Sequence, residues 1–179
     1  SLMRWATLGG QILFLLVPTV LIARLRPPGP RFFFRWRIPD YREIILVCIA
    51  VFALQQVLQV YLMVQDTIPL PGPVRQVVEE FKRLIEETYR LLVTAHSPGE
   101  LGFVVLVAAV VPAVCEELLF RGVLQRSFEQ GTNGLRAALI TGVIFGAYHL
   151  SPFTIVPLAV LGMFFGFVLY RTGNILVSM

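Results

Sequence analysis

The segment "VCEELLFRGVL" (residues 114–124) places Glu116, Glu117 and Arg121 in an otherwise apolar stretch, and "GVIFGAYHL" (142–150) does the same with His149. A carboxylate and an imidazole that share one water-filled pocket can perform general acid–base chemistry. In a membrane interior each ionisable group costs about 2.5–3.5 kcal/mol on insertion scales, so such groups are usually functional or paired. These four side chains are therefore the candidates for chemistry.

The two glutamates predict different roles. Neighbouring residues on a helix point about 100° apart, so Glu116 and Glu117 cannot face the same spot. Glu117 and Arg121 are four residues apart and can form an ion pair that offsets both charges. Glu116 has no basic partner nearby in the sequence, and we interpret it as a carboxylate directed at a cavity. The alternative is that all three side chains snorkel at the membrane surface, but the apolar sequence resumes after the glutamates.

His149 can reach the depth of Glu116 if the two apolar segments form an antiparallel hairpin. With a turn near residue 131, Glu116 lies 15 residues before the turn and His149 lies 18 residues after it. At 1.5 Å per residue the two depths differ by only about 5 Å. We therefore expect the two side chains to meet. Without the hairpin, a lone histidine on an apolar helix is a packing or interfacial residue.

The composition indicates a membrane protein. The chain has 179 residues, 56% of them hydrophobic and 15% charged, with a mean hydropathy of +0.76, whereas about a quarter of the residues in a soluble domain are charged. A membrane helix needs about 20 apolar residues. The apolar runs are Trp5–Ala23, Ile44–Val64, Leu101 to about Leu124, Ala137–Tyr148, Pro152–Tyr170 and a last run from Ile175 to Met179.

These runs predict an all-α, polytopic membrane helix bundle with five complete transmembrane helices and the start of a sixth. The last run is too short to cross a bilayer, so we expect the chain to be a piece of a longer protein. Gly142 with Gly146, and Gly162 with Gly166, form two GxxxG pairs, which favour close packing of membrane helices. Cys48 and Cys115 lie in apolar runs and are expected to be small buried thiols.

Residues 74–93, "VRQVVEEFKRLIEETYRLLV", form a separate amphipathic segment. Its apolar residues recur at helical spacing and its charges occupy the other face. This pattern predicts an interfacial helix that lies on the membrane surface or caps the bundle. A solvated connector helix is the alternative, and the pattern leaves the role of this helix open.

The positive charge is concentrated in one loop. The net charge is +4, and the loop of residues 24–42 holds Arg24, Arg26, Arg31, Arg35, Arg37 and Arg42. Nucleic-acid binding is one interpretation, but between two membrane helices such arginines follow the positive-inside rule. We expect a multi-pass integral membrane protein, in the plasma or inner membrane if the source is prokaryotic, with loop 24–42 cytoplasmic. Membrane lipid is then the expected partner, and nucleic acid is not.

Two motifs carry a resemblance to a known family. "EELLFRG" (116–122) fits EExxxR, "FGAYH" (145–149) fits FxxxH, and the sequence contains no HExxH or GxSxG. The two motifs on successive membrane helices resemble the CAAX-protease and bacteriocin-processing (CPBP, or Abi) family of intramembrane endopeptidases. "RTGNIL" (171–176) looks like the start of that family's last core helix. The resemblance divides the chain into residues 1–99, with N-terminal membrane helices, and residues 100–179, a catalytic core truncated at its C-terminal end.

The resemblance implies hydrolysis of peptide bonds in membrane-associated substrates, either CAAX-type lipidated proteins or leader and bacteriocin-like peptides. Glu116 would activate the attacking water, and His149 would orient water or stabilise the tetrahedral intermediate. Glu117, Arg121 and Phe145 would support the site. A third family motif, a histidine followed four residues later by an asparagine, would come after the last residue, so these 179 residues are expected to be inactive alone.

The resemblance favours a mechanism that uses Glu116 and His149 without a cofactor. These two side chains would be the ligands for a divalent metal, and a catalytic zinc typically takes three protein ligands. The histidine of the third motif would make three, so the sequence leaves a divalent metal open. One alternative is a non-catalytic membrane scaffold or immunity protein on the same fold. Another is a small transporter in which Glu116 carries protons, although no inverted repeat is visible in the sequence.

Overall fold

The computed structural model describes residues 2–69 and 71–179, and helices are the only regular secondary structure in these two ranges. Four helices are long and apolar enough to cross a membrane: Leu2–Leu25, Tyr41–Asp66, Pro98–Glu129 and Ile155–Thr172. The all-α prediction is confirmed, but the count differs from five. The remaining apolar helix, Gly134–Tyr148, has 15 residues, about 22 Å of helix, which is shorter than a hydrocarbon core of about 30 Å.

The N-terminal span is one continuous helix, made of α1 (Leu2–Gly10), the π-helical segment η1 (Gln11–Leu16) and α2 (Val17–Leu25). It stops before Pro27 and Pro28, where proline lacks the amide hydrogen that a helix needs. The short helix α3 (Pro30–Phe34) follows and buries Phe33 and Phe34 in the core. The arginine-rich loop is therefore folded against the bundle.

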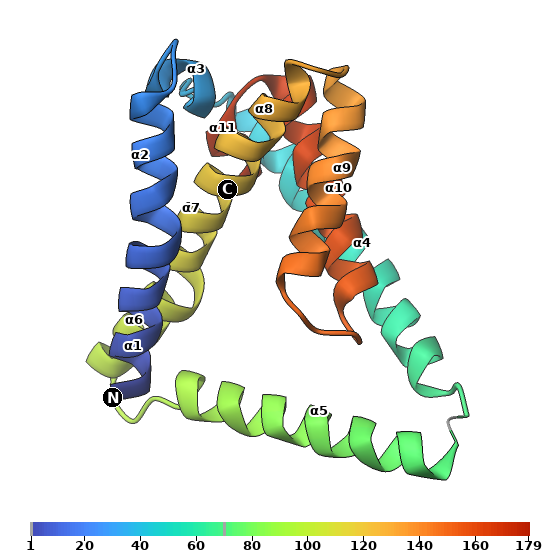
Figure 1. The fold of residues 1–179 in the computed structure, drawn as a ribbon. Coiled ribbons are helices and arrows are strands. Elements are labelled where there is room, and N and C mark those ends of the chain that lie inside the picture. Colours follow the sequence, from blue (N-terminus) through green and yellow to red (C-terminus); the bar gives the residue numbers. More distant parts are fainter. Residues whose placement is uncertain (1, 70) are drawn as a thin grey trace.

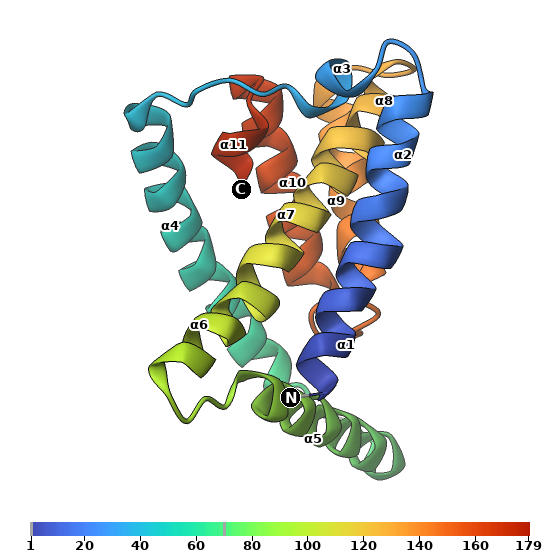
Figure 2. The same cartoon turned by 90° about the vertical axis from the view of Figure 1, so that its left-hand side faces the viewer.

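Helix α4 (Tyr41–Asp66) lies at the outside of the bundle (Figure 2). Asp40 and Glu43 form a capping box at its start, which satisfies amide groups that the first turn leaves free. None of its residues is buried, and an apolar cavity of about 480 Å³ separates part of it from α10 and α11. The prediction of two buried thiols is wrong for Cys48, which is exposed on this peripheral helix, whereas Cys115 is buried.

Helix α5 (Gly72–Val93) is the predicted amphipathic segment, and it crosses below the ends of the other helices in Figure 1. No residue of α5 is buried, so side-chain contacts hold it. In the middle of the helix, Lys82 pairs with Asp66 of α4 at 2.5 Å, and Phe81 packs on Phe153 with ring centroids 6.0 Å apart. At its C-terminal end, the Arg4 guanidinium donates to the carbonyl of Leu92 at 3.0 Å. Contacts at the middle and at one end thus attach α5 to the bundle.

The third span is a long helix at the centre of the molecule. It consists of α6 (Pro98–Val105), π-helical η2 (Leu106–Val110), α7 (Val111–Glu117), π-helical η3 (Leu118–Leu124) and α8 (Gln125–Glu129). It packs against η1 and α2 on one side and against α9 and α10 on the other. Half of its buried residues lie in η3, more than in any other segment of this span, so the segment that carries most of the EExxxR motif lies in the core of the bundle.

Helices α9 (Gly134–Tyr148) and α10 (Ile155–Thr172) form a hairpin beside this central helix (Figure 1). A Cβ atom on Gly146 would lie 2.5 Å from the Ile155 carbonyl oxygen, and one on Gly162 would lie 3.0 Å from the Gly142 Cα. The predicted close approach at the two glycine pairs is therefore confirmed. The chain continues into α11 (Ile175–Ser178), whose Ile175 packs in the core.

Candidate active site

The predicted ion pair is present in the middle of the central helix. Glu117 is the last residue of α7, and Arg121 lies in the π-helical segment that follows. Arg121 Nε lies 3.4 Å from Glu117 Oε2, and the side chains are only 1% and 6% exposed, respectively. Two opposite charges that are buried together largely cancel, and each would be costly without the other. The pair therefore belongs to the interior of the bundle and not to its surface.

Aromatic rings enclose the Arg121 guanidinium. Its central carbon lies 4.6 Å from the ring centre of Phe145 and 5.6 Å from that of Phe165. Its Nη2 atom also donates to the Gly162 carbonyl oxygen at 3.3 Å. Cation–π contacts are strongest where water is excluded. Arg121 thereby joins the central helix to both helices of the hairpin, and its charge is directed inward.

His149 follows the last turn of α9 and is half-buried. Its Nδ1 atom lies 2.8 Å from the Phe145 carbonyl oxygen. A carbonyl oxygen only accepts hydrogen bonds, so Nδ1 is the donor in this contact. In the neutral imidazole, Nε2 then keeps its lone pair. The Phe145 ring packs against the imidazole with centroids 4.7 Å apart, which fixes the direction in which Nε2 points.

Glu116 differs from Glu117 as the sequence predicts. It is half-buried, and it makes no hydrogen bond or ion pair with the part of the chain that the structure describes. Arg121 and His149 are the basic side chains in the neighbourhood of its carboxylate. Because Arg121 is already paired with Glu117, His149 is the neighbour that remains for Glu116. The hairpin thus places His149 in the neighbourhood of Glu116.

A chain of aromatic rings connects the two motifs. Phe120 contacts Phe145 and Tyr148, with centroids 5.0 Å and 5.4 Å away, and Tyr148 contacts His149 at 5.8 Å. Phe120 is buried, whereas Tyr148 is 45% exposed. Sequence analysis did not assign a function to either ring. The available signal was position, since Phe120 follows Glu116 by four residues and Tyr148 directly precedes His149.

The residues around Glu116 do not fit a catalytic zinc site. No group of three or more histidine, cysteine, aspartate or glutamate side chains within residues 2–69 and 71–179 is arranged to hold a metal ion. Glu116 and His149 supply two ligands, and the neighbouring Cys115 is buried with 1% exposure. A catalytic zinc takes three protein ligands and keeps an open position.

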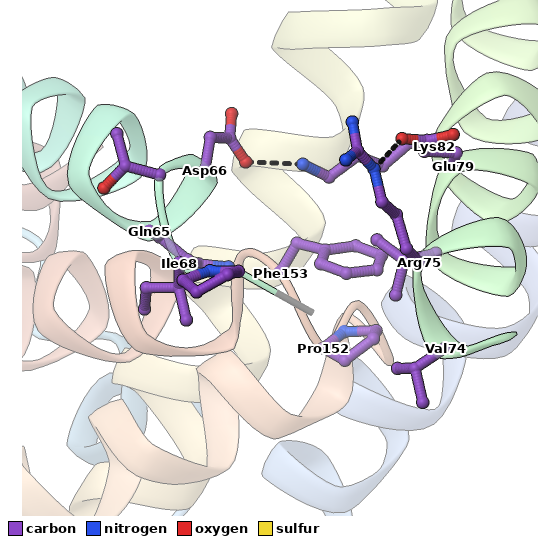
Figure 3. A pocket seen from close by; sticks show the side chains of 12 residues that line it. Gln65, Asp66, Ile68, Val74, Arg75, Glu79, Lys82, Pro152 and Phe153 are labelled. Carbon is purple, nitrogen blue, oxygen red and sulfur yellow. Dashed lines mark hydrogen bonds and ion pairs between the residues drawn. The ribbon is translucent and has the colours of Figure 1, made fainter. Parts of the chain in front are cut away.

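A cavity of about 600 Å³ lies between the end of α4, the first half of α5 and the loop after His149 (Figure 3). Phe153 and Pro152 lie on one side of it, and the ion pairs Asp66–Lys82 and Arg75–Glu79 lie along the other (Figure 3). None of the side chains predicted to be catalytic lines this cavity. It is therefore distinct from the Glu116–His149 site, although the α9–α10 loop connects the two.

Comparison with known proteins agrees with this geometry. Residues 98–179 match the family model described as "Type II CAAX prenyl endopeptidase Rce1-like". The match begins at the first residue of α6 and contains both motifs, the hairpin and α11. No curated protein and no solved structure is significantly similar to the chain. The segment 98–179 is therefore similar to the Rce1-like type II CAAX prenyl endopeptidases, the CAAX proteases of the CPBP family, and this similarity points to a membrane protease.

Proposed function

We propose that this protein is an intramembrane endopeptidase in which Glu116 activates the attacking water. The observation that carries the proposal is that two adjacent carboxylates have different surroundings. Glu117 is buried and paired with Arg121, whereas Glu116 is partly accessible, unpaired within the described residues and close to His149. A general base needs a free carboxylate in reach of water, and Glu116 is the one that meets this condition.

The proposed reaction begins with a water molecule between Glu116 and His149. The Nε2 lone pair of His149 accepts one hydrogen bond from this water and orients it. Glu116 removes a proton as the water oxygen attacks the scissile carbonyl carbon, and the carbonyl electrons move to its oxygen. When the tetrahedral intermediate collapses, the leaving nitrogen takes the proton from Glu116. The carboxylate is then regenerated.

Glu117, Arg121 and Phe145 are proposed to act as positioning residues. The ion pair lies directly after Glu116 in the chain, and the guanidinium contacts Phe145, whose carbonyl oxygen accepts from His149. A displacement at any of these contacts would move Glu116 relative to His149. A shift of about 1 Å in a catalytic group can cost a hundredfold in rate. We infer that these residues fix the position of Glu116 relative to His149.

The proposed substrates are CAAX-type lipidated proteins or leader and bacteriocin-like peptides that reach the site from the membrane. Membrane lipid is the second partner, and no nucleic-acid partner is proposed. Hydrolysis is proposed to proceed without a metal, because Glu116 and His149 offer only two ligands.

In the proposed topology five apolar segments cross the membrane and α11 starts a sixth. Helix α5 lies at the surface, and residues 1–99 support a core formed by residues 100–179.

The test is cleavage of candidate peptides by the purified full-length protein and its Glu116→Gln variant. A fluorogenic prenylated CAAX peptide and a leader-type peptide are each used as substrate. Glu116→Gln keeps the size of the side chain and removes the base, so we expect cleavage to fall by about 100-fold or more. Glu80→Gln, an exposed carboxylate on α5, is the matched control and should cleave at the wild-type rate.

Two further results would argue against the proposal. Undiminished cleavage by Glu116→Gln would remove Glu116 from the chemistry. Loss of cleavage after treatment with a metal chelator, restored by a divalent ion, would overturn the metal-free mechanism. If a cellular function of the protein survives loss of both Glu116 and His149, the scaffold alternative is correct instead.

A further inference from the structure

Positive charge is uncompensated at one end of the bundle. The segments 24–43, 125–136 and 171–174 lie together at this end in both views (Figure 1 and Figure 2). They contain nine arginines and three acidic residues, which gives a local net charge of +6, whereas the whole chain carries +4. Every basic residue in these segments is an arginine, although the chain also contains a lysine, Lys82 on α5. This end therefore carries a concentrated charge of one chemical kind.

The acidic residues at this end are all used within the fold. They have these partners: Glu129 pairs with Arg35 and Arg126, Glu43 pairs with Arg37, and Asp40 accepts from the backbone amide of Arg42. Arg37 also donates to the Thr172 carbonyl at 3.4 Å, which joins the loop to the end of α10. The other arginines are exposed and form no ion pair among the described residues: Arg24, Arg26, Arg31, Arg42, Arg136 and Arg171. These six free arginines add nothing to the fold through ion pairs, so their charge is available to a partner.

Large apolar or aromatic side chains are exposed beside five of the six free arginines. Leu25 lies between Arg24 and Arg26 and is 80% exposed. The other three arginines share one arrangement, in which an exposed side chain directly precedes each of them: Tyr41 before Arg42, Leu135 before Arg136 and Tyr170 before Arg171. A soluble acidic ligand would leave these apolar groups in water. The boundary between lipid headgroups and acyl chains covers both kinds of side chain, and aromatic residues are enriched at this depth. The arrangement therefore favours a lipid surface as the partner.

The chemistry of the free arginines also selects among lipids. A guanidinium group can donate two parallel hydrogen bonds to one phosphate. Every phospholipid has this phosphate, but the choline or ethanolamine group of a zwitterionic lipid adds a cation, which uncompensated arginines repel. The headgroup of phosphatidylglycerol adds no cation. Basic segments next to membrane helices attract anionic lipids for this reason.

We propose that the six free arginines form a binding surface for anionic phospholipids in the leaflet that surrounds this end of the bundle. The guanidinium groups hold the phosphates, and the exposed side chains beside them contact the glycerol and the first carbons of the acyl chains. Helix α5 at the opposite end lacks this property, because its four basic residues are balanced by four glutamates. The selection of anionic lipid is thus restricted to one end, and it does not depend on the proposed proteolytic function.

The test places the purified full-length protein in nanodiscs that contain equal amounts of phosphatidylglycerol and phosphatidylcholine with the same acyl chains. Native mass spectrometry then identifies the lipids that stay bound to the released protein. We expect bound phosphatidylglycerol to exceed bound phosphatidylcholine by about fivefold or more in the wild type. In Arg31→Gln/Arg136→Gln/Arg171→Gln the excess should fall below about twofold, because half of the free arginines are removed.

A second triple variant, Arg75→Gln/Arg83→Gln/Arg90→Gln, is the matched control. It removes the same charge from exposed positions on α5, so it changes the net charge of the protein equally. It should keep most of the excess of phosphatidylglycerol. An equal loss in the two triple variants would overturn the proposal, because the preference would then follow net charge and not the arginines of one end.

Thermal unfolding in nanodiscs of a single lipid gives an independent measurement. A ligand that binds only the folded protein stabilises it, so the wild type should have a Tm about 2 °C or more higher in phosphatidylglycerol than in phosphatidylcholine. The variant with substitutions at Arg31, Arg136 and Arg171 should lose this difference and match the wild-type Tm in phosphatidylcholine.

Two further results would overturn the proposal. One is equal retention of the two lipids by the wild type. The other is binding of a hexaglutamate peptide to the wild type in pure phosphatidylcholine nanodiscs, together with displacement of phosphatidylglycerol from the mixed ones. That result would assign the surface to an acidic protein partner instead.

Discussion

Arg121 is a buried residue whose contacts connect several helices in the interior of this protein. Its guanidinium contacts a carboxylate, a backbone carbonyl and two aromatic rings that come from three different helices. It is 1% exposed. Removing one partner of a buried ion pair leaves the other charge without compensation, and this typically costs about 3–5 kcal/mol. The pair therefore gives a stability prediction that is independent of catalysis.

Arg121→Met is expected to lower the free energy of unfolding by about 3–5 kcal/mol, because Glu117 then stays buried without a countercharge. The double variant Glu117→Leu/Arg121→Met should recover much of this loss, since no unpaired charge remains. The measurement is thermal or denaturant-induced unfolding of the purified protein in detergent. Arg83→Met is the control. Its ion pair with Glu87 is exposed and 3.8 Å long, so it should change stability by less than about 1 kcal/mol.

At the residue scale, an equal loss of unfolding free energy in Arg121→Met and Arg83→Met would contradict the structure. A double variant that is less stable than either single variant would do the same, because it would show that the pair contributes by packing and not by charge. Both results can be read without any knowledge of the substrate.

At the scale of elements, the hairpin of α9 and α10 determines where His149 lies. The helices touch through glycine, so their backbones approach more closely than side chains would allow. Gly146 is three residues before His149 and faces the start of α10. The π-helical segment η3 starts directly after Glu117, and π-helical turns are frequent at functional sites. The two motifs thus lie on elements whose local geometry differs from that of a regular, isolated helix.

Gly146→Ala is expected to destabilise the protein by about 1–3 kcal/mol through overpacking. The added Cβ would lie 2.5 Å from the Ile155 carbonyl oxygen and 2.7 Å from the Ala159 amide nitrogen, and backbone atoms cannot move aside cheaply. Cleavage should decrease as well, because separation of α9 from α10 displaces His149. Unfolding and cleavage are measured on the same preparations.

Gly102→Ala is the control at this scale. Gly102 lies in α6, and a Cβ there would meet nothing within 4 Å. Alanine favours a helix by up to about 1 kcal/mol over glycine, so this variant should be as stable as the wild type or more stable. Destabilisation by Gly102→Ala comparable to that by Gly146→Ala would show that the hairpin contact is not the cause.

At the scale of the whole molecule, charge is distributed unevenly between the two ends of the bundle. The arginine-rich loop, the α8–α9 turn and the end of α10 lie together at one end (Figure 1). Several of their arginines are exposed and take part in no ion pair among the described residues: Arg24, Arg26, Arg31, Arg42, Arg136 and Arg171. Helix α5, in which four glutamates balance four basic residues, lies at the other end. This asymmetry supports the proposed orientation, with loop 24–42 cytoplasmic.

The orientation can be tested by labelling of single cysteines in a Cys48→Ser/Cys115→Ser background. A membrane-impermeant thiol reagent applied to intact cells should not label Arg31→Cys until the membrane is opened. It should label Glu80→Cys on α5 directly, because α5 is expected at the opposite surface. Labelling of both positions from one side, or the reverse pattern, would overturn the orientation. The two variants serve as controls for each other.

Several features of the molecule could be predicted from the sequence alone. Helix geometry alone distinguishes Glu116 from the Glu117–Arg121 pair, because it determines the directions in which these side chains point. The cost of ionisable groups in a membrane indicates that all three are functional or paired. The positions of the apolar helices and of the amphipathic helix follow from periodicity and composition in the same local way. The expectation that His149 lies near Glu116 needed one further assumption, the hairpin, and the hairpin is present. The similarity of residues 98–179 to the CAAX endopeptidases was predictable from the two motifs.

The tertiary structure decided what depends on contacts between helices. The third span contains π-helical segments, and α9 is shorter than the apolar spans around it. Phe165 and the Gly162 carbonyl, distant in sequence, complete the surroundings of Arg121, and Tyr148 is directed toward the site by Phe120. Cys48 proved exposed because α4 packs at the edge of the bundle. Periodicity gives the direction of a side chain around its own helix, but only packing determines which neighbour it meets.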